Sequence, residues 1–301
     1  MQSGMPRRSK TLTGPNRESS TTEMDSNTKV LEWLRRRELR DGTIPQALKT
    51  YERLLVLWSN WGFLGPQVRM TRDSANARLE KGVPLLTFQE LDFDWARFVD
   101  LYRDVASLLA ACSPAVQENG QRDLALECSL PLLKEAAGAW FSGNTPTASP
   151  DEADTAILEF AVQAAIKPLL ARYRDALLPL VDMQGWRRTY CPVCGGQPYF
   201  SFLDREHGAR WLVCSRCDAE WLFQRLQCPF CGNQDPNSLS YFTNDQALYR
   251  LYVCDDCGRY LKAIDLRKAT DEAPLPIEYL LTTEMDRQAH EQGYVRAAAT
   301  N

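Results

Sequence analysis

The chain has 301 residues, of which 44% are hydrophobic and 25% are charged, and its formal net charge is -4. These values are ordinary for a globular protein with a hydrophobic core, and the acidic balance argues against a surface that binds nucleic acids generally. No stretch is long and apolar enough to span a bilayer. Polar residues follow Arg7-Arg8 where a twin-arginine export signal needs an apolar segment. We therefore expect a cytoplasmic protein without membrane insertion.

The first half of the chain is predicted to be helical. Residues 1–27 are rich in Ser, Thr, Asn and Arg, which predicts a disordered tail. Residues 28–184 are expected to form an all-helical domain, because apolar residues recur at steps of three and four, most clearly over 88–112. Ser149-Pro150-Asp151-Glu152 has the composition of a helix start, and Pro168 is expected to kink or split the helix behind it. Weaker helical patterns cover 30–39, 44–58 and 124–141.

The composition changes near Gly185, where short strand-like runs begin to alternate with cysteine pairs. The runs cover 199–203, 210–213, 239–243 and 249–253. Two blocks, 185–225 and 226–267, repeat the same outline and open with closely similar sequences. We therefore predict a multi-domain chain, in which an all-α N-terminal domain precedes two tandem metal-binding β modules. A C-terminal segment, 268–301, is expected to contain a short helix from about Ile277 to His290.

Eight of the ten cysteines form four Cys-x-x-Cys pairs, a spacing that favours metal binding over disulfides in a chain without a secretion signal. Two such pairs can turn four thiolates toward one tetrahedral site. A residue that tolerates left-handed backbone follows each pair: Gly195, Asp218, Gly232 and Gly258. The simplest assignment groups neighbouring pairs, and an interleaved assignment is the rival. Site 1 is then Cys191, Cys194, Cys214 and Cys217, and site 2 is Cys228, Cys231, Cys254 and Cys257.

Small modules of this kind bury little apolar surface, so a structural metal is the favoured role for both sites. Electron transfer through iron remains open, whereas thiol–disulfide exchange is less favoured because no pair starts a helix in a βαβ unit. A closed four-thiolate site has no position for the water of a catalytic zinc. Spacing alone does not distinguish iron from zinc.

The remaining chemical candidates are weak. Cys112 and Cys128 lie in helical stretches and are expected to be small core residues. His207 and His290 have no triad context, and no Ser or Asp nucleophile motif is present, so an enzyme is not predicted. Arginines and aromatic residues mix between the cysteine pairs, which suits either nucleic-acid binding or, as we favour, packing and balance of thiolate charge. These residues are Trp211, Trp221, Phe230, Tyr241 and Tyr260, with Arg205, Arg210, Arg216, Arg225 and Arg259.

The order of these motifs resembles the FdhE family of formate dehydrogenase accessory proteins. The similarity runs through Cys191-Pro-Val-Cys194-Gly195-Gly196-Gln197-Pro198, then Arg210-Trp211-Leu212-Val213-Cys214-Ser215-Arg216-Cys217 with Glu220-Trp221, and on through Cys228-Pro-Phe-Cys231-Gly232 to Cys254-Asp-Asp-Cys257-Gly258-Arg259-Tyr260-Leu261-Lys262. All eight family cysteines are present.

The resemblance implies a non-catalytic maturation factor, or chaperone, that binds the catalytic subunit of respiratory formate dehydrogenase before its export. It also implies that the modules are rubredoxin-like and that iron is the bound metal. An electron carrier acting on the same enzyme is the first alternative, and a nucleic-acid-binding zinc-ribbon protein is a weaker one. A homodimer is left open.

Overall fold

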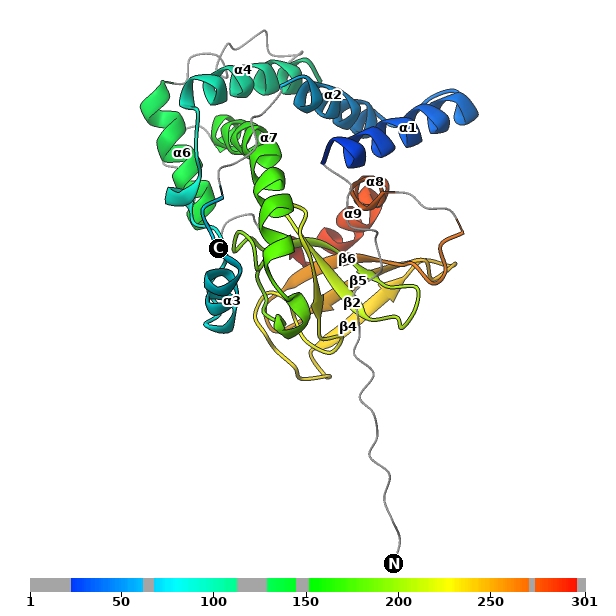
Figure 1. Cartoon of the computed structure of the whole chain (residues 1–301). Helices are drawn as coiled ribbons and strands as arrows, with labels where there is room; N and C mark the ends of the chain where they lie inside the picture. The colour runs from blue at the N-terminus through cyan, green and yellow to red at the C-terminus, as the bar shows by residue number, and fades with distance from the viewer. Residues whose placement is uncertain (1–22, 62–67, 113–128, 145–151, 271–273, 297–301) are drawn as a thin grey trace, which may run out of the picture.

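The computed structural model describes residues 23–61, 68–112, 129–144, 152–270 and 274–296. Helices form the upper part of the molecule in Figure 1, and a β-sheet forms the lower part. The helices are α1 (Glu23–Asp41), α2 (Gln46–Asn60), α3 (Arg72–Glu80), α4 (Trp95–Cys112), α6 (Leu130–Ser142) and α7 (Glu152–Leu177), with short 3-10 turns at Phe88–Glu90, Leu178–Leu180 and Met183–Gly185. Among the described residues no strand precedes Pro198, so the predicted helical first half is confirmed.

The predicted helices form where the apolar residues recur, with differences at their ends. The stripe on α4 buries Phe98, Tyr102 and Val105, as expected. Helix α1 begins at Glu23, inside the segment predicted as a tail, because polar residues can extend a helix whose next turns are packed. Residues 1–22 and the predicted helix start at 149–151 lie outside the described residues.

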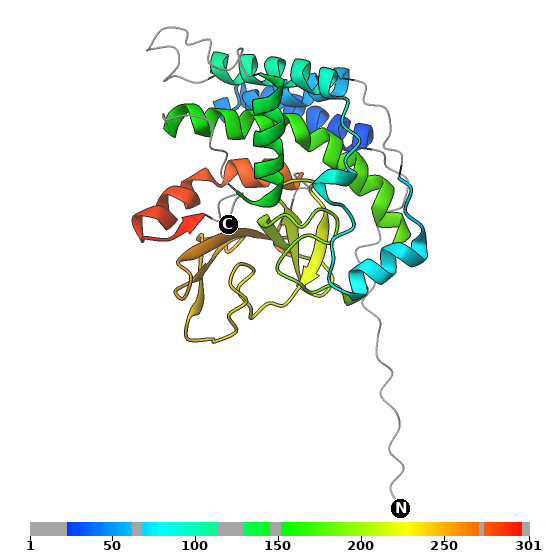
Figure 2. The same ribbon diagram turned by 90° about the vertical axis from the view of Figure 1, so that its left-hand side faces the viewer.

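Helix α3 was missed because it is short and polar, and of its residues only Ala75 is buried. Pro168 lies inside α7, which stays one helix and bends along its length (Figure 2). None of the described helices combines the length and apolar content needed to cross a bilayer.

The cysteine-rich half forms one sheet with the strand order β3-β2-β1-β6-β5-β4. The strands are β1 (Pro198–Leu203), β2 (Arg210–Cys214), β3 (Glu220–Phe223), β4 (Leu239–Thr243), β5 (Tyr249–Cys254) and β6 (Arg259–Asp265), and the short β7 (Val295–Arg296) pairs with β6. Each cysteine block contributes three antiparallel strands, and the parallel pairing of β1 with β6 joins the two blocks. The two predicted modules are therefore halves of one continuous sheet.

The C-terminal segment crosses one face of this sheet as two helices, α8 (Leu275–Leu281) and α9 (Thr283–Glu291), where one helix was predicted. Both lie between the sheet and the upper helices in Figures 1 and 2. The chain turns at Thr282 because the Lys262 ammonium, from β6, donates to the carbonyl oxygens of Tyr279 and Thr282 at 3.0 and 3.2 Å. A cation at the end of α8 suits the helix dipole.

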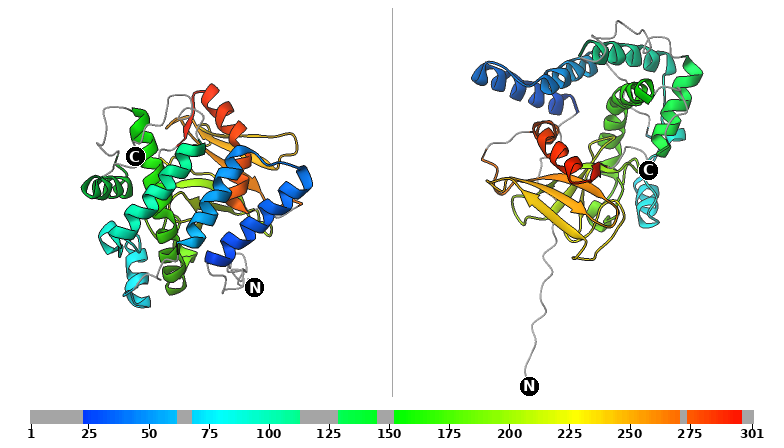
Figure 3. Two further views of the ribbon diagram at one scale, coloured as in Figure 1. Left: turned by 90° about the horizontal axis from the view of Figure 1, so that it is seen from above. Right: turned by 180° about the vertical axis from the view of Figure 1, so that it is seen from behind.

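One hydrophobic core cluster, the most extensive of three among the described residues, runs from the helices into the first half of the sheet. It joins Trp140 and Leu170 of the helices to Leu212 and Trp221 of the strands, all essentially inaccessible to solvent. Seen from above in Figure 3, α1, α2, α4 and α7 cover the sheet as a layer. The first cysteine group lies within this shared core, and the second lies outside it. Near the second group, the partly buried Phe230 packs against the core.

Candidate metal centres

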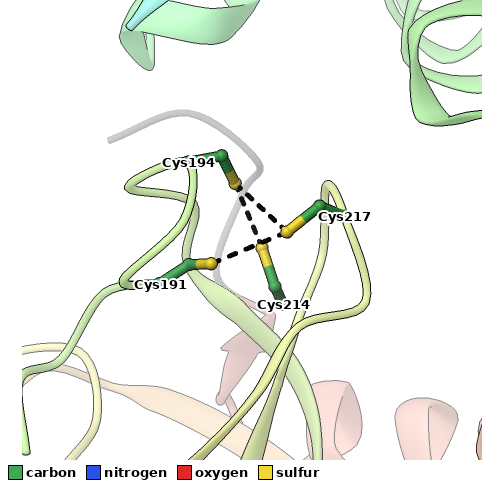
Figure 4. Close-up of side chains that lie close together, drawn as sticks. All are labelled: Cys191, Cys194, Cys214 and Cys217. Atoms are coloured by element: carbon green, nitrogen blue, oxygen red, sulfur yellow. Dashed lines mark hydrogen bonds between the residues drawn. The ribbon is translucent and has the colours of Figure 1, made fainter. Parts of the chain in front are cut away.

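The structure gathers the eight cysteines into two groups. Centre 1 consists of Cys191, Cys194, Cys214 and Cys217, and centre 2 consists of Cys228, Cys231, Cys254 and Cys257. Within each group the four Sγ atoms lie within 4.8 Å of one another. This is the adjacent grouping of neighbouring pairs. The sulfurs of centre 1 point toward a common point from two facing loops (Figure 4).

The sulfur spacing fits a tetrahedral ion. A metal–sulfur bond of about 2.3 Å separates neighbouring sulfurs by about 3.8 Å in that geometry. In centre 1 the Sγ atoms of Cys194 and Cys214 are 3.5 Å apart, and those of Cys191 and Cys217 are 3.6 Å apart. In centre 2 the Cys228–Cys257 and Cys231–Cys254 pairs are both 3.7 Å apart. All-sulfur ligands suit zinc or iron.

Each cysteine pair sits in a turn of the same design. The residue after the second cysteine donates its backbone N–H to the first cysteine's carbonyl, as Gly195 does to Cys191 at 2.9 Å. All four of these residues have left-handed backbone, as predicted from their types. The φ angles are 71° at Gly195, 54° at Asp218, 79° at Gly232 and 64° at Gly258. A backbone N–H also donates to sulfur in one of these turns, from Arg216 to Cys214 Sγ at 3.4 Å.

Centre 1 is held by the helical domain as well as by the sheet. Its four cysteines are at most 2% exposed. The backbone N–H groups of Leu85 and Leu86, just before the 3-10 turn at Phe88–Glu90, donate to the carbonyls of Pro192 and Val193 in the first cysteine loop of the centre. From α7, Arg174 donates to the Cys217 carbonyl at 2.8 Å.

Arg216 connects centre 1 to α6. It stacks on Trp140 and Phe141 of α6 and donates to the carbonyls of Cys194 and Trp140. Arg216 was singled out from its place among the cysteines, but its partners on α6 come from a part of the chain with no recognisable motif.

Centre 2 is open to solvent. Cys228 and Cys254 are buried, but Cys231 is exposed and Cys257 is partly exposed. Its neighbour Arg210 reaches across from β2 and lies over the ring of Tyr252, with the guanidinium carbon 4.3 Å from the ring centre. Burial lowers the pKa of Arg210 to about 10, so the side chain stays positive at neutral pH.

The thiol groups within each centre differ in the direction of their pKa shifts. Burial raises the pKa of Cys191 well above its usual value, and hydrogen bonds among the thiols raise it further. Burial acts in the same direction at Cys214, but hydrogen bonds from the other three thiols outweigh it and bring its pKa well below the usual value. In centre 2 the pKa of Cys257 rises to about 11, while that of Cys231 falls. Burial thus opposes negative charge on these sulfurs, and a bound cation would offset that cost.

The other candidate residues do not assemble into a site. His207 lies in the β1–β2 turn beside Glu206, and His290 lies against the ring of Tyr260. Cys112 is partly exposed at the end of α4, so it is less buried than predicted, and Cys128 lies outside the described residues. Trp221 is buried and donates to the Arg188 carbonyl, which agrees with the packing role favoured for the aromatics.

Fold and sites together define a protein with a helical domain fused to a β-rich region that carries two four-cysteine groups. Residues 190–225 match the family model described as FdhE, central domain. The FdhE homologue of Aquifex aeolicus (strain VF5) is 30% identical over 235 residues, which cover 76% of this chain and 77% of the relative. An FdhE homologue of Enterobacter sp. (strain 638) is also 30% identical, over 64% of this chain and 62% of the relative.

This chain belongs to the FdhE family. The crystal structure of the FdhE protein from Pseudomonas aeruginosa has the same fold, with a TM-score of 0.63 and 23% sequence identity. That match covers 91% of this chain and 93% of the other. The resemblance inferred from the cysteine motifs is thus confirmed, and it extends over the helical domain, where no motif could be recognised.

Proposed function

We propose that this protein is a cytoplasmic, non-catalytic accessory factor for the assembly of formate dehydrogenase, and that it binds the enzyme's catalytic subunit before export. Membership of the FdhE family carries the proposal. The grouping of all eight cysteines into two centres of four sulfurs each supports it, because four thiolates stabilise a binding scaffold and complete the coordination of a tetrahedral ion, which leaves no position for a substrate.

The test is co-purification with the catalytic subunit. A tagged catalytic subunit, expressed with its export segment, is expected to retain this protein from a reducing lysate. The same subunit without the export segment tests whether that segment is recognised. An unrelated exported subunit with a similar segment serves as the control. Absence of retention under both reducing and oxidising conditions would count against the proposal.

We further propose that both centres hold a metal ion, with iron favoured by the family resemblance and zinc as the alternative. The sulfur spacing supports a tetrahedral ion but does not choose between the two metals. Metal analysis of protein purified without added metal, together with its visible absorption spectrum, distinguishes them. Two iron ions per chain with thiolate-to-iron absorption are expected. Two zinc ions and a colourless protein would overturn the choice of iron while leaving the centres in place.

A second candidate is an electron carrier for the same enzyme. The exposure of Cys231 favours it, because an electron can reach a centre whose ligand lies at the surface. If iron is bound at centre 2, it supplies a one-electron couple there. A potentiometric titration should then show reversible reduction in the physiological range. Redox-inert zinc at centre 2 excludes this candidate.

A further inference from the structure

A small pocket opens beside centre 2, and every charged residue that lines it is an arginine. Arg210, Arg225 and Arg259 contribute its positive charge, and Phe230 and Tyr252 contribute aromatic surface. Cys228 and Cys254 belong to the same lining. The pocket contains no carboxylate, so this part of the surface is positive although the whole chain is acidic.

The arginines of the pocket have fewer hydrogen-bonding partners than Arg267, which lies elsewhere in the sheet region. Arg267 uses its Nε and Nη2 atoms to hold both oxygens of Asp265, at 2.8 and 2.6 Å. The same two atoms of Arg210 are buried and have no hydrogen-bond partner among the described residues, although its Nη1 donates to the Gln227 carbonyl. Within that part of the chain no ion pair involves Arg225, which is exposed, or Arg259, which lies over Phe230. Burying a guanidinium with two unsatisfied N–H donors is costly, and a negative charge nearby offsets part of that cost. A carboxylate is the group that best matches the paired N–H donors of accessible guanidinium groups such as those of Arg225 and Arg259.

The charge of centre 2 accounts for part of this arrangement. Four thiolates around a divalent ion carry two net negative charges, so three guanidinium groups exceed them by one positive charge. The lining of the pocket would therefore keep a positive charge when centre 2 holds a divalent ion. The pocket volume is about 30 Å³. That space equals roughly two water positions, which is enough for the two oxygens of a carboxylate.

The pocket is continuous with an open edge of the sheet. Leu239 and Ser240 line the pocket and begin β4, the last strand of the order. Among the described strands β4 pairs with β5 alone, and its Tyr241 and Phe242 are about half exposed, at 52% and 45%. An extended segment can add to such an edge through backbone hydrogen bonds while its side chains enter neighbouring pockets.

We propose that this pocket binds a carboxylate side chain from an extended acidic segment of a partner protein. Arg225 and Arg259 meet the carboxylate at the mouth, and Arg210 provides positive charge at the floor. The identification of the partner with the catalytic subunit rests on the proposed function, but the presence of the carboxylate site does not.

The experiment measures the binding of a labelled heptapeptide to the metal-loaded full-length protein by fluorescence anisotropy at low salt. The peptide contains two glutamates among valines and threonines. The matched peptide carries glutamine in place of glutamate. We expect Arg225→Gln and Arg259→Gln each to weaken binding of the acidic peptide about tenfold, because each removes a charge-assisted hydrogen bond. Arg205→Gln makes the same charge change on the exposed β1–β2 turn, outside the pocket, and should leave binding unchanged.

Sodium acetate and sodium chloride at equal ionic strength then test whether a carboxylate is recognised. Greater displacement of the peptide by acetate supports the proposal, and equal displacement overturns it because simple screening would then explain the binding. Equal affinity of the wild-type protein for the acidic and the glutamine peptide would also overturn it. Equal affinity of the wild type and both arginine variants for the acidic peptide would do the same. So would tighter binding of oligothymidylate than of the acidic peptide. If the acidic peptide binds as expected and the catalytic subunit is not retained, the proposed function fails and this inference stands.

Discussion

Asp218 has left-handed backbone at a position where the other three cysteine turns have glycine. Aspartate tolerates this conformation better than most residues, but it still costs more than glycine. The side chain explains its presence, because Lys167 of α7 donates to its carboxylate at 2.8 Å. This ion pair adds to the contacts of Arg174 and Arg216 that tie the turn of Cys214 and Cys217 to the helical domain.

Gly196 is the second residue whose type is explained by centre 1. A Cβ atom there would lie 3.0 Å from Cys214 Sγ and 2.9 Å from Arg216 Cδ. We expect Gly196→Ala to destabilise the protein by about 1–3 kcal/mol and to weaken metal binding at centre 1, because the buried sulfur has no room to move. Thermal unfolding and metal content measure both effects. Gly185→Ala, where a Cβ meets nothing within 4 Å, is the matched control. Equal stability of the two variants would contradict this packing argument.

The burial of the Glu278 carboxyl group leads us to predict that stability depends on pH. Glu278 is 6% exposed on α8 and accepts a hydrogen bond from Tyr249 of β5. Burial raises its pKa above the usual value, outweighing the Tyr249 hydrogen bond and the charge of Arg37. The folded protein therefore binds this proton more tightly than the unfolded chain does. Its stabilisation is complete below the unfolded pKa of about 4.3 and is lost as pH rises through the higher folded value.

Glu278→Gln removes this titration, so its stability relative to wild type should improve as pH rises from 5 to 8. Urea unfolding at several pH values, with Glu38→Gln at an exposed position of α1 as the control, measures the difference. A stability difference between Glu278→Gln and wild type that does not change with pH would exclude this role.

At the scale of elements, the Tyr260-Leu261-Lys262 motif holds the C-terminal helices on the sheet. Tyr260 donates to one oxygen of Asp286 at 2.8 Å, and the buried Lys262 ammonium donates to the other at 2.6 Å. Asp286 belongs to α9, and the same ammonium bonds the last carbonyls of α8. Tyr260 and Lys262, two residues of the family signature, thus position both helices.

Asp286→Ala should destabilise the protein by about 3 kcal/mol, because it leaves the Lys262 ammonium buried without its counter-ion. Denaturant unfolding measures the loss, and hydrogen exchange should show α8 and α9 opening first. Glu284→Ala changes the same helix at an exposed carboxylate and should have little effect. Comparable losses in the two variants would show that the buried pair is not what holds these helices.

At the scale of the whole molecule, the two centres differ in their surroundings although their sequences are alike. Centre 1 lies in the core shared by helices and sheet, and centre 2 lies beside an open pocket with one cysteine exposed. A cysteine ligand at the surface can release its ion to a chelator, whereas release of an ion from a buried centre requires the core to open first.

We therefore expect a chelator to remove the two ions in separate kinetic phases, with the ion of centre 2 released first. Cys231→Ser should abolish the fast phase and leave the helical signal in circular dichroism nearly unchanged. Cys194→Ser should lower the midpoint of thermal unfolding for the whole chain, including the helices, because its centre is part of their core. Release of both ions in one phase, or equal effects of the two serine variants, would show that the centres are equivalent.

Much of this architecture follows from local sequence patterns. The boundaries of β4, the apolar stripe of α4 and the left-handed turns after the cysteine pairs depend on residues close together in the chain, so they could be predicted. The strands β3 and β6 and the turn at Thr282 were not predicted. The turn depends on Lys262, which lies 20 residues away.

By itself, the sequence determined that eight cysteines form two neighbouring four-sulfur groups behind a helical domain, because two-residue spacing and turn-forming residues act locally. Tertiary structure decided the rest. The parallel pairing of β1 with β6 merges the blocks into one sheet, and the contacts of Leu85, Arg174 and Arg216 draw centre 1 into the helical core. The same packing leaves centre 2 at the surface beside the arginine pocket, since burial is set by which distant segments meet.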